Sequence, residues 1–133
     1  MSHYVDIETN ICDGEALVRA LERVGFKGQV EVHEIAQALY GYQGDRRQQK
    51  ANIILRREHV GSASNDIGFE LMESGRYRSH ISEFDQSKYG QEWQDKLNTY
   101  YGVEKAKKEY EVRNIKYEED VDEKERPRLR AFL

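Results

Sequence analysis

The sequence contains a single cysteine, Cys12, and a single proline, Pro127. One cysteine excludes an internal disulfide and any metal site built from several cysteine ligands. No apolar run approaches the roughly 20 residues that a membrane-spanning helix requires, and the first ten residues lack the charged and apolar segments of a secretory signal. These absences predict a cytoplasmic protein, or a stromal one if the chain is plastid-encoded, that makes no membrane contact.

Length and charge balance narrow the class of protein further. The chain has 133 residues, the size of one ordinary domain, and we expect residues 1–133 to form a single domain. A chain of this length buries enough surface to fold without a metal or a disulfide. The net charge of −4 provides no general attraction for nucleic acid or an anionic membrane. Nine tyrosines are present, and tyrosine is typical of the rim of a core or an interface.

The clearest structural signal is the stretch NDIGFELMESGRYRSHI at residues 65–81. Ile67 and Phe69 alternate with polar or small residues, which is the period of two that a half-buried strand shows. Ser74 and Gly75 can form the turn, because glycine accepts a positive φ, and the alternation then resumes. The stretch predicts a β-hairpin with Phe69 in the core.

Apolar stripes with a period of 3.6 residues predict two helices. The first begins with Asp13 as N-cap and ends at Gly25, and the second runs from about Ser87 to Glu109 across Gly102. A polar connection is expected at 45–50 and an acidic turn at 118–125. Outside the hairpin, strands are predicted at 3–11, 29–42, 51–57, 112–117 and 127–133. This order predicts an α+β fold, a mainly antiparallel sheet with two helices packed on one face as a two-layer sandwich.

The sequence shows no local pattern for a metal, a cofactor or a catalytic group. The four histidines form no HxH, HxxxH or HExxH pair. His3 falls on the apolar side of the first strand, where a hydrogen-bonded core histidine is a more common role than a ligand. Cys12 is followed by an acidic residue, which disfavours a reactive thiolate. We therefore expect no metal, no cofactor and no enzymatic activity.

A basic cluster is the one feature that favours nucleic acid. Arg46, Arg47, Lys50, Arg56 and Arg57 lie close together in the sequence, and nearby tyrosines could stack on bases. The acidic net charge favours a solvated surface instead. Weak nucleic-acid binding is therefore one alternative, and it requires these arginines to share a face with exposed aromatic rings.

Several stretches in collinear order together resemble one protein family. They are residues 2–21 (SHYVDIETNICDGEALVRAL), 41–44 (GYQG), 51–56 (ANIILR), 65–69 (NDIGF), 74–77 (SGRY), 93–108 (WQDKLNTYYGVEKAKK) and 128–132 (RLRAF). The chain is similar to the family called domain of unknown function 1257, whose plastid members carry the name hypothetical chloroplast reading frame 35. It departs from the family at Ser74, where an acidic residue is common, and in its last two residues, where Arg-Trp is common.

The resemblance implies an accessory protein and no catalytic residue, and some members are encoded near AAA+ ATPases of the MoxR type. We expect an adaptor that binds another protein, with a MoxR-type ATPase as the family-level partner. The residues that match the family or lie on the tyrosine-rich helix are the candidate binding residues: His3, Tyr42, Asp66, Tyr100, Tyr101 and Arg128. The main alternative is a small enzyme or ligand-binding domain whose site is assembled from distant residues such as His3, Asp66 and Tyr101.

The adjacent rings of Tyr100 and Tyr101 cannot both point into the core. Consecutive side chains on a helix are about 100° apart. We therefore expect one ring to be buried and the other to lie nearer the rim, where it is available to a partner.

Overall fold

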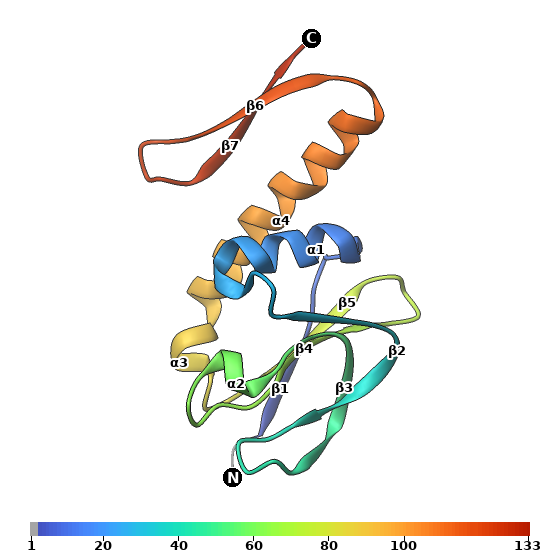
Figure 1. The fold of residues 1–133 in the computed structure, drawn as a ribbon, viewed down its shortest axis with the longest axis vertical. Coiled ribbons are helices and arrows are strands. Elements are labelled where there is room, and N and C mark those ends of the chain that lie inside the picture. The colour runs from blue at the N-terminus through green and yellow to red at the C-terminus, as the bar shows by residue number, and fades with distance from the viewer. Residues whose placement is uncertain (1–2) are drawn as a thin grey trace.

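The computed structural model describes residues 3–133 and shows a five-stranded antiparallel sheet, a separate two-stranded sheet and four α-helices (Figure 1). The elements are β1 (Tyr4–Glu8), α1 (Gly14–Leu21), the π-helical turn η1 (Glu22–Phe26), β2 (Val30–Tyr40), β3 (Arg46–Leu55), α2 (Arg57–Val60), β4 (Ile67–Leu71), β5 (Tyr77–Ser82), α3 (Gln86–Tyr89), α4 (Gln91–Val112), β6 (Lys116–Val121) and β7 (Pro127–Phe132). The predicted α+β class is confirmed. The prediction of two helices is wrong, because the single turns α2 and α3 accompany the two long ones.

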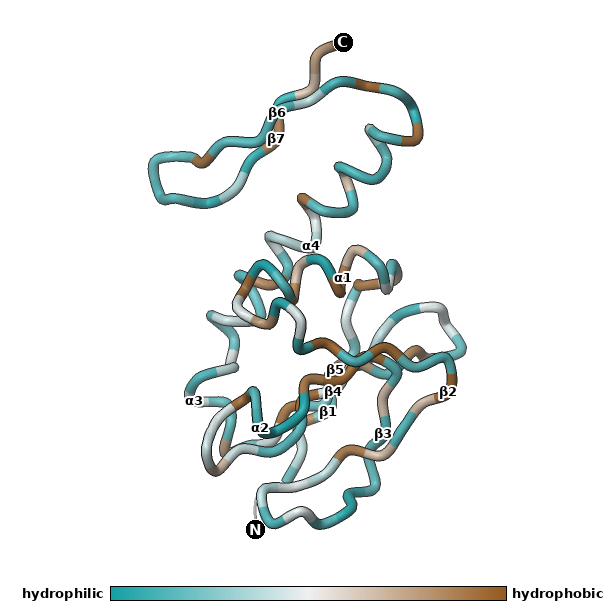
Figure 2. Tube along the Cα trace, viewed as in Figure 1, coloured by the Kyte–Doolittle hydropathy of each residue, from teal (hydrophilic) through white to brown (hydrophobic). Residues whose placement is uncertain are grey.

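The large sheet has the strand order β1-β5-β4-β3-β2, so the predicted hairpin β4–β5 lies in its interior. Its apolar face packs on α1 and α4 in one core cluster, to which Phe69, Leu17 and Leu97 belong. Figure 2 shows hydrophobic residues gathered in the central strands and α1. Asp13 caps α1 as predicted, because its side chain accepts a hydrogen bond from the amide of Ala16.

The β2–β3 hairpin curls over the other face of the sheet and closes a second, smaller core. Leu39, Ala51 and Ile54 pack there with the ring of Tyr4. A Cβ atom at Gly68 would lie 2.6 Å from the Cβ of Ala51, so only glycine allows the curled hairpin to approach β4 this closely. Residues 46–50 of the expected polar connection at 45–50 are in fact the start of β3, because they lie opposite the end of β2.

The first strand presents its sides differently from the prediction. We expected His3, Val5 and Ile7 to face the core, but His3 is exposed and Ile7 is more than one-third exposed, whereas Tyr4 on the opposite side is buried. The reason is position: β1 is an edge strand, and the curled hairpin covers the side that carries Tyr4.

The C-terminal strands do not join the large sheet. β6 and β7 pair only with each other, at the far end of α4 from the large sheet (Figure 1). The predicted acidic turn at 118–125 is wrong for its first half, because β6 continues to Val121 and the turn follows it. The acidic residues of β6 face basic partners on β7, as in the pair Asp120–Arg128 at 2.6 Å, and cross-strand charge pairs of this kind favour strand pairing.

An ion-pair cluster fastens the β6–β7 hairpin to the helices. Glu119 on β6 binds Arg23 of η1 at 2.5 Å and Lys107 of α4 at 2.7 Å. Arg23 also binds the buried Glu104 of α4 at 2.8 Å, and its guanidinium lies 4.6 Å from the centre of the Tyr100 ring. The hydrogen bond from Arg23, assisted by Lys107, lowers the pKa of Glu119 against the opposing effect of burial.

Acidification is expected to loosen the β6–β7 hairpin before the core unfolds. A carboxyl whose pKa is lowered on folding stabilises the fold above its ordinary pKa, and this stabilisation is lost as the pH falls through the folded value. In an NMR titration from pH 7 to pH 3, amide signals of β6 and β7 should therefore shift before that of Phe69. Asp120 and Asp122 also have lowered pKa values, held down by Arg128 and Arg126, so their protonation adds to the loosening as the pH falls.

The variant Glu119→Gln isolates the contribution of the ion-pair cluster. This variant leaves Asp120 and Asp122 in place. The early shift of the amide signals should therefore disappear where β6 faces Arg23 but persist in the turn between β6 and β7. An unchanged early shift in this variant would contradict the assignment to Glu119.

Candidate functional site

Asp66 is a buried structural residue rather than an open ligand site. It is 1% exposed, and one carboxylate oxygen accepts hydrogen bonds from the amide of Tyr40 at 2.8 Å and the guanidinium of Arg56 at 2.9 Å. The other oxygen accepts from the amide of Arg57 at 2.7 Å, and its backbone carbonyl accepts from the hydroxyl of Tyr4 at 2.5 Å. Asp66 therefore ties the curled β2–β3 hairpin to β1 and to the start of α2.

Tyr42 lies beside Asp66 and is bound through its backbone. Its amide donates to the side-chain oxygen of Asn65 at 2.9 Å, and its carbonyl accepts from Arg57 at 3.0 Å. The side-chain amide of Asn65 donates in turn to Ser82 and Asp85. Through this network, the start of the NDIGF segment joins the curled hairpin to the end of β5 by buried polar contacts. The ring of Tyr42 takes no part in it and is partly exposed.

Tyr100 and Tyr101 point to different sides of α4. Tyr101 is buried, and its hydroxyl oxygen accepts hydrogen bonds from the amides of Cys12 and Asp13, at 3.1 and 3.0 Å. Tyr100 is half-buried under Arg23. One ring is therefore buried and the other lies nearer the rim, as the helical spacing predicts.

The six candidate residues do not converge on one site. Asp66 and Tyr42 are neighbours, but Arg128 is on β7, which lies at the opposite end of the molecule from the N-terminus, near which His3 falls (Figure 1). Tyr101, Tyr100 and Asp66 line three separate crevices. Within residues 3–133, no three histidine, cysteine or acidic side chains come together as a metal would require. A catalytic site assembled from His3, Asp66 and Tyr101 therefore has no geometric support.

The basic cluster is divided by the fold. Arg47 of β3 packs with its guanidinium 5.1 Å from the centre of the Tyr4 ring. Arg56 is neutralised by Glu31 at 2.9 Å and Asp66 at 2.9 Å. The condition for nucleic-acid binding, several free arginines on one face with exposed rings, is not met by these two residues.

A groove runs between the edge strand β1 and helix α4, and we call it the β1–α4 groove. It has a volume of about 460 Å³. One wall is residues 7–11, which are the end of β1 and the segment after it, and the other wall is formed by Gln91, Gln94, Asn98 and Tyr101 of α4. Apart from Glu8, its lining is uncharged, and it combines side-chain amides with the partly exposed Ile7. These three amides were not among the predicted binding residues, although their spacing of three and four residues places them on one helix face.

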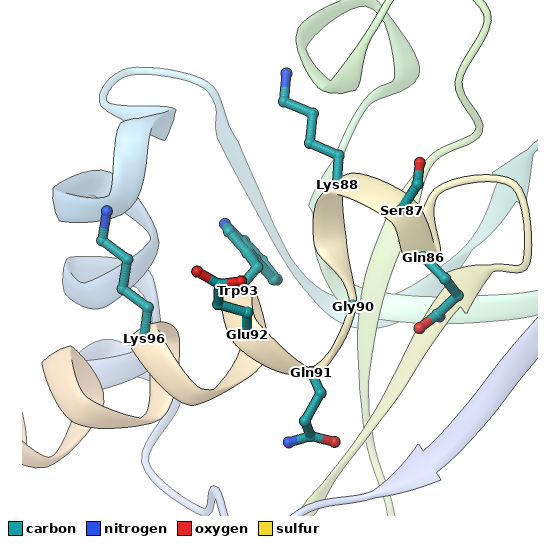
Figure 3. Close-up of a pocket in the computed structure, with 8 residues that line it drawn as sticks. All are labelled: Gln86, Ser87, Lys88, Gly90, Gln91, Glu92, Trp93 and Lys96. Carbon is teal, nitrogen blue, oxygen red and sulfur yellow. The ribbon is translucent and has the colours of Figure 1, made fainter.

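The opposite side of α4 borders a second space, which we call the α4–hairpin crevice. It has a volume of about 690 Å³ and lies between Tyr100, Thr99 and Lys96 on α4 and the β6–β7 turn at residues 124–127. Its lining is strongly charged. A third crevice follows the bend between α3 and α4 at Gly90. Figure 3 shows Lys88 and Lys96 extending to one side of it and Gln91 to the other.

No helix within residues 3–133 combines the length and the apolarity that crossing a bilayer requires. Comparison of the chain with protein-family models, with curated proteins and with solved structures found no match.

Proposed function

We propose that this protein is a non-enzymatic adaptor that binds another protein through the β1–α4 groove. The observation that carries the proposal is the groove itself, a space of about 460 Å³ between an edge strand and a helix. Its lining combines side-chain amides with one apolar side chain. A bound polypeptide presents matching groups, because its backbone can hydrogen-bond to the amides and its apolar side chains can pack against the apolar one. Exposed strand edges beside a helix are a recurring mode of peptide recognition.

The walls of the groove are held firmly, which favours recognition because less order must be imposed on binding. Tyr101 fixes α4 to the start of α1 through the amides of Cys12 and Asp13. Lys108 adds an ion pair with Asp13 at 2.9 Å. Burial acts to raise the pKa of Asp13, but hydrogen bonds from Lys108 and the amide of Ala16 lower it overall, so this carboxylate stays charged where it joins the two helices.

The resemblance to the family called domain of unknown function 1257 supports a partner of the MoxR-type AAA+ ATPase class, acting in the cytoplasm or, for a plastid-encoded chain, in the stroma. Tyr100, the half-buried neighbour of Tyr101 on α4, lines the α4–hairpin crevice, so the two sides of the helix are competing sites for this partner.

Two neighbouring substitutions on α4 distinguish these sites. Asn98 and Thr99 are both exposed, but Asn98 lines the β1–α4 groove and Thr99 lines the α4–hairpin crevice. The partner would be captured from the host with the wild-type protein, identified by mass spectrometry and titrated against each variant. Asn98→Arg is expected to weaken the complex about 5- to 150-fold, which corresponds to the loss of about 1–3 kcal/mol typical of a disturbed hot spot, while Thr99→Arg binds as the wild type does.

The reverse pattern would move the interface to the crevice beside Tyr100. Recovery of no specific partner, or equal binding by wild type and both variants, would contradict the proposed function. Both variants should keep the wild-type melting temperature, because both side chains are on the surface.

A further inference from the structure

We infer that the partner contributes an extended segment that adds to β1 as a sixth strand of the sheet, with lysine or arginine at alternate positions. This inference rests on the proposed function, because it takes the β1–α4 groove as the binding site. It adds the conformation of the bound segment and the chemistry of its side chains.

The hydrogen bonds around β1 show which of its backbone groups are free. The amide of Thr9 donates to Tyr77 at 3.1 Å, and the carbonyl of His3 accepts from Glu83 at 2.7 Å, both toward β5. Because backbone groups in an antiparallel pair alternate in direction, the odd-numbered residues of β1 bond to β5. The even-numbered residues Tyr4, Asp6 and Glu8 direct their N–H and C=O groups outward, and within residues 3–133 no partner occupies them.

The other edge of the sheet is a poorer template. β2 has a register shift between Val32 and Gln37, and the side chain of Asn52 already donates to the carbonyls of His33 and Glu34. Bulges of this kind protect an edge from further pairing. β1, by contrast, pairs with β5 over five consecutive residues without a shift, so it offers a regular row of donors and acceptors.

The charges beside β1 specify the side chains of the added strand. Asp6 and Glu8 lie two residues apart on β1, with side chains on the strand face opposite that of Ile7, and these side chains are 40% and 60% exposed. Asp6 contacts His80, Glu8 contacts Arg78, and Glu70 lies against the other ring nitrogen of His80. Three carboxylates thus face one guanidinium and one imidazole. Residues directly opposite in a sheet share a face, so alternate basic residues of the added strand would lie against Asp6 and Glu8.

The intervening residues of the added strand would point into the β1–α4 groove. There they would meet Ile7 and the side-chain amides of Gln91, Gln94 and Asn98. Small or medium uncharged side chains suit this lining. The expected segment is therefore a short run in which basic and uncharged residues alternate.

A second copy of this chain does not satisfy the same requirement. The antiparallel register that pairs the full length of β1 with itself places Asp6 opposite Asp6. Like charges directly opposite in a sheet are destabilising. The acidic edge thus disfavours self-pairing and favours a basic segment from another protein.

The test uses the full chain and a synthetic peptide, acetyl-Lys-Val-Lys-Thr-Lys-Val-Lys-amide. Amide hydrogen exchange is followed by NMR with and without the peptide. We expect exchange at Tyr4, Asp6 and Glu8 to slow at least tenfold, while Val5 and Ile7, already bonded to β5, change little. This alternating pattern is specific to strand addition, because binding by charge alone would not protect every second amide.

Two control peptides separate the contribution of backbone hydrogen bonds to the affinity from the contribution of charge. A peptide with N-methyl groups on alternate residues cannot form the ladder, and a peptide with glutamate in place of lysine has the wrong sign; each should bind at least tenfold more weakly. The double variant Asp6→Asn, Glu8→Gln should lose affinity for the lysine peptide. It should keep its own fold, because the asparagine side chain introduced in place of Asp6 can still accept a hydrogen bond from His80.

Unprotected amides at Tyr4, Asp6 and Glu8 with saturating peptide, or equal binding of the N-methylated peptide, would overturn the inference. Such a result would leave the adaptor function standing if the captured partner remained sensitive to Asn98→Arg. Failure of that sensitivity would instead count against the proposed function.

Discussion

Replacing Phe69 by alanine is expected to destabilise the protein by about 3–5 kcal/mol, the usual range for a buried phenylalanine. Phe69 is 2% exposed and lies in the middle of β4, paired with Ile53 on one side and Ser79 on the other. Its ring is part of the cluster that joins the sheet to α1 and α4. Truncation leaves a cavity where the three elements meet, and a close-packed interior fills such a cavity only in part.

Urea denaturation followed by circular dichroism measures this loss. Phe84→Ala is the matched control, because the Phe84 side chain is 55% exposed and its removal should change stability by no more than about 0.5 kcal/mol. Equal urea midpoints for the Phe69 and Phe84 variants would show that the ring of Phe69 is not a core element.

Much of the interior of this fold could be predicted from the sequence. The alternation at Ile67 and Phe69 specifies the strand and its buried face, and both residues lie in the core. Gly75 takes a φ of +86° at the turn, the conformation for which glycine was expected there. The predicted second helix is found as α4, which runs from Gln91 to Val112 through Gly102, but its predicted start near Ser87 is wrong because Gly90 separates α3 from α4. These features depend on residues close together in the chain, so a local pattern is enough to predict them.

Long-range pairing explains the errors. The sequence around β6 and β7 has strand character, but nothing local states that these strands pair only with each other. The face of β1 was misassigned for a similar reason, since Tyr4 is buried by a hairpin that comes much later in the chain. The hairpin can cover Tyr4 only because Gly68 lets it approach β4 closely. This role of Gly68 becomes apparent only when β4 and the curled hairpin are brought together.

The candidate site was predictable in part. The helical spacing of Tyr100 and Tyr101 correctly separated a buried ring from a rim ring. The amides at Gln91, Gln94 and Asn98 share one face of α4 by the same rule, yet they stand out only once β1 is placed opposite them. A groove between two elements is a property of their relative placement, which no single element encodes.

Removing the carboxylate of Asp66 is expected to cost about 3–5 kcal/mol, the range for breaking one side of a buried ion pair. In Asp66→Ala, Arg56 loses its buried partner, and the amides of Tyr40 and Arg57 lose their acceptor. Asp66→Asn keeps an oxygen acceptor but removes the charge, so its loss should be smaller. The junction between the curled hairpin, β1 and α2 would then weaken rather than break.

Glu31→Ala provides the matched control, because Glu31 is the second partner of Arg56 but is 39% exposed. Water can replace an exposed carboxylate, whereas it cannot reach the site of Asp66, so we expect a clearly smaller destabilisation. Chemical denaturation of the three variants should give the order Asp66→Ala, Asp66→Asn, Glu31→Ala from least to most stable. If Asp66→Ala and Glu31→Ala lost the same stability, the buried network would contribute no more than a surface ion pair. Asp66 would then be a candidate ligand-binding residue rather than a structural one.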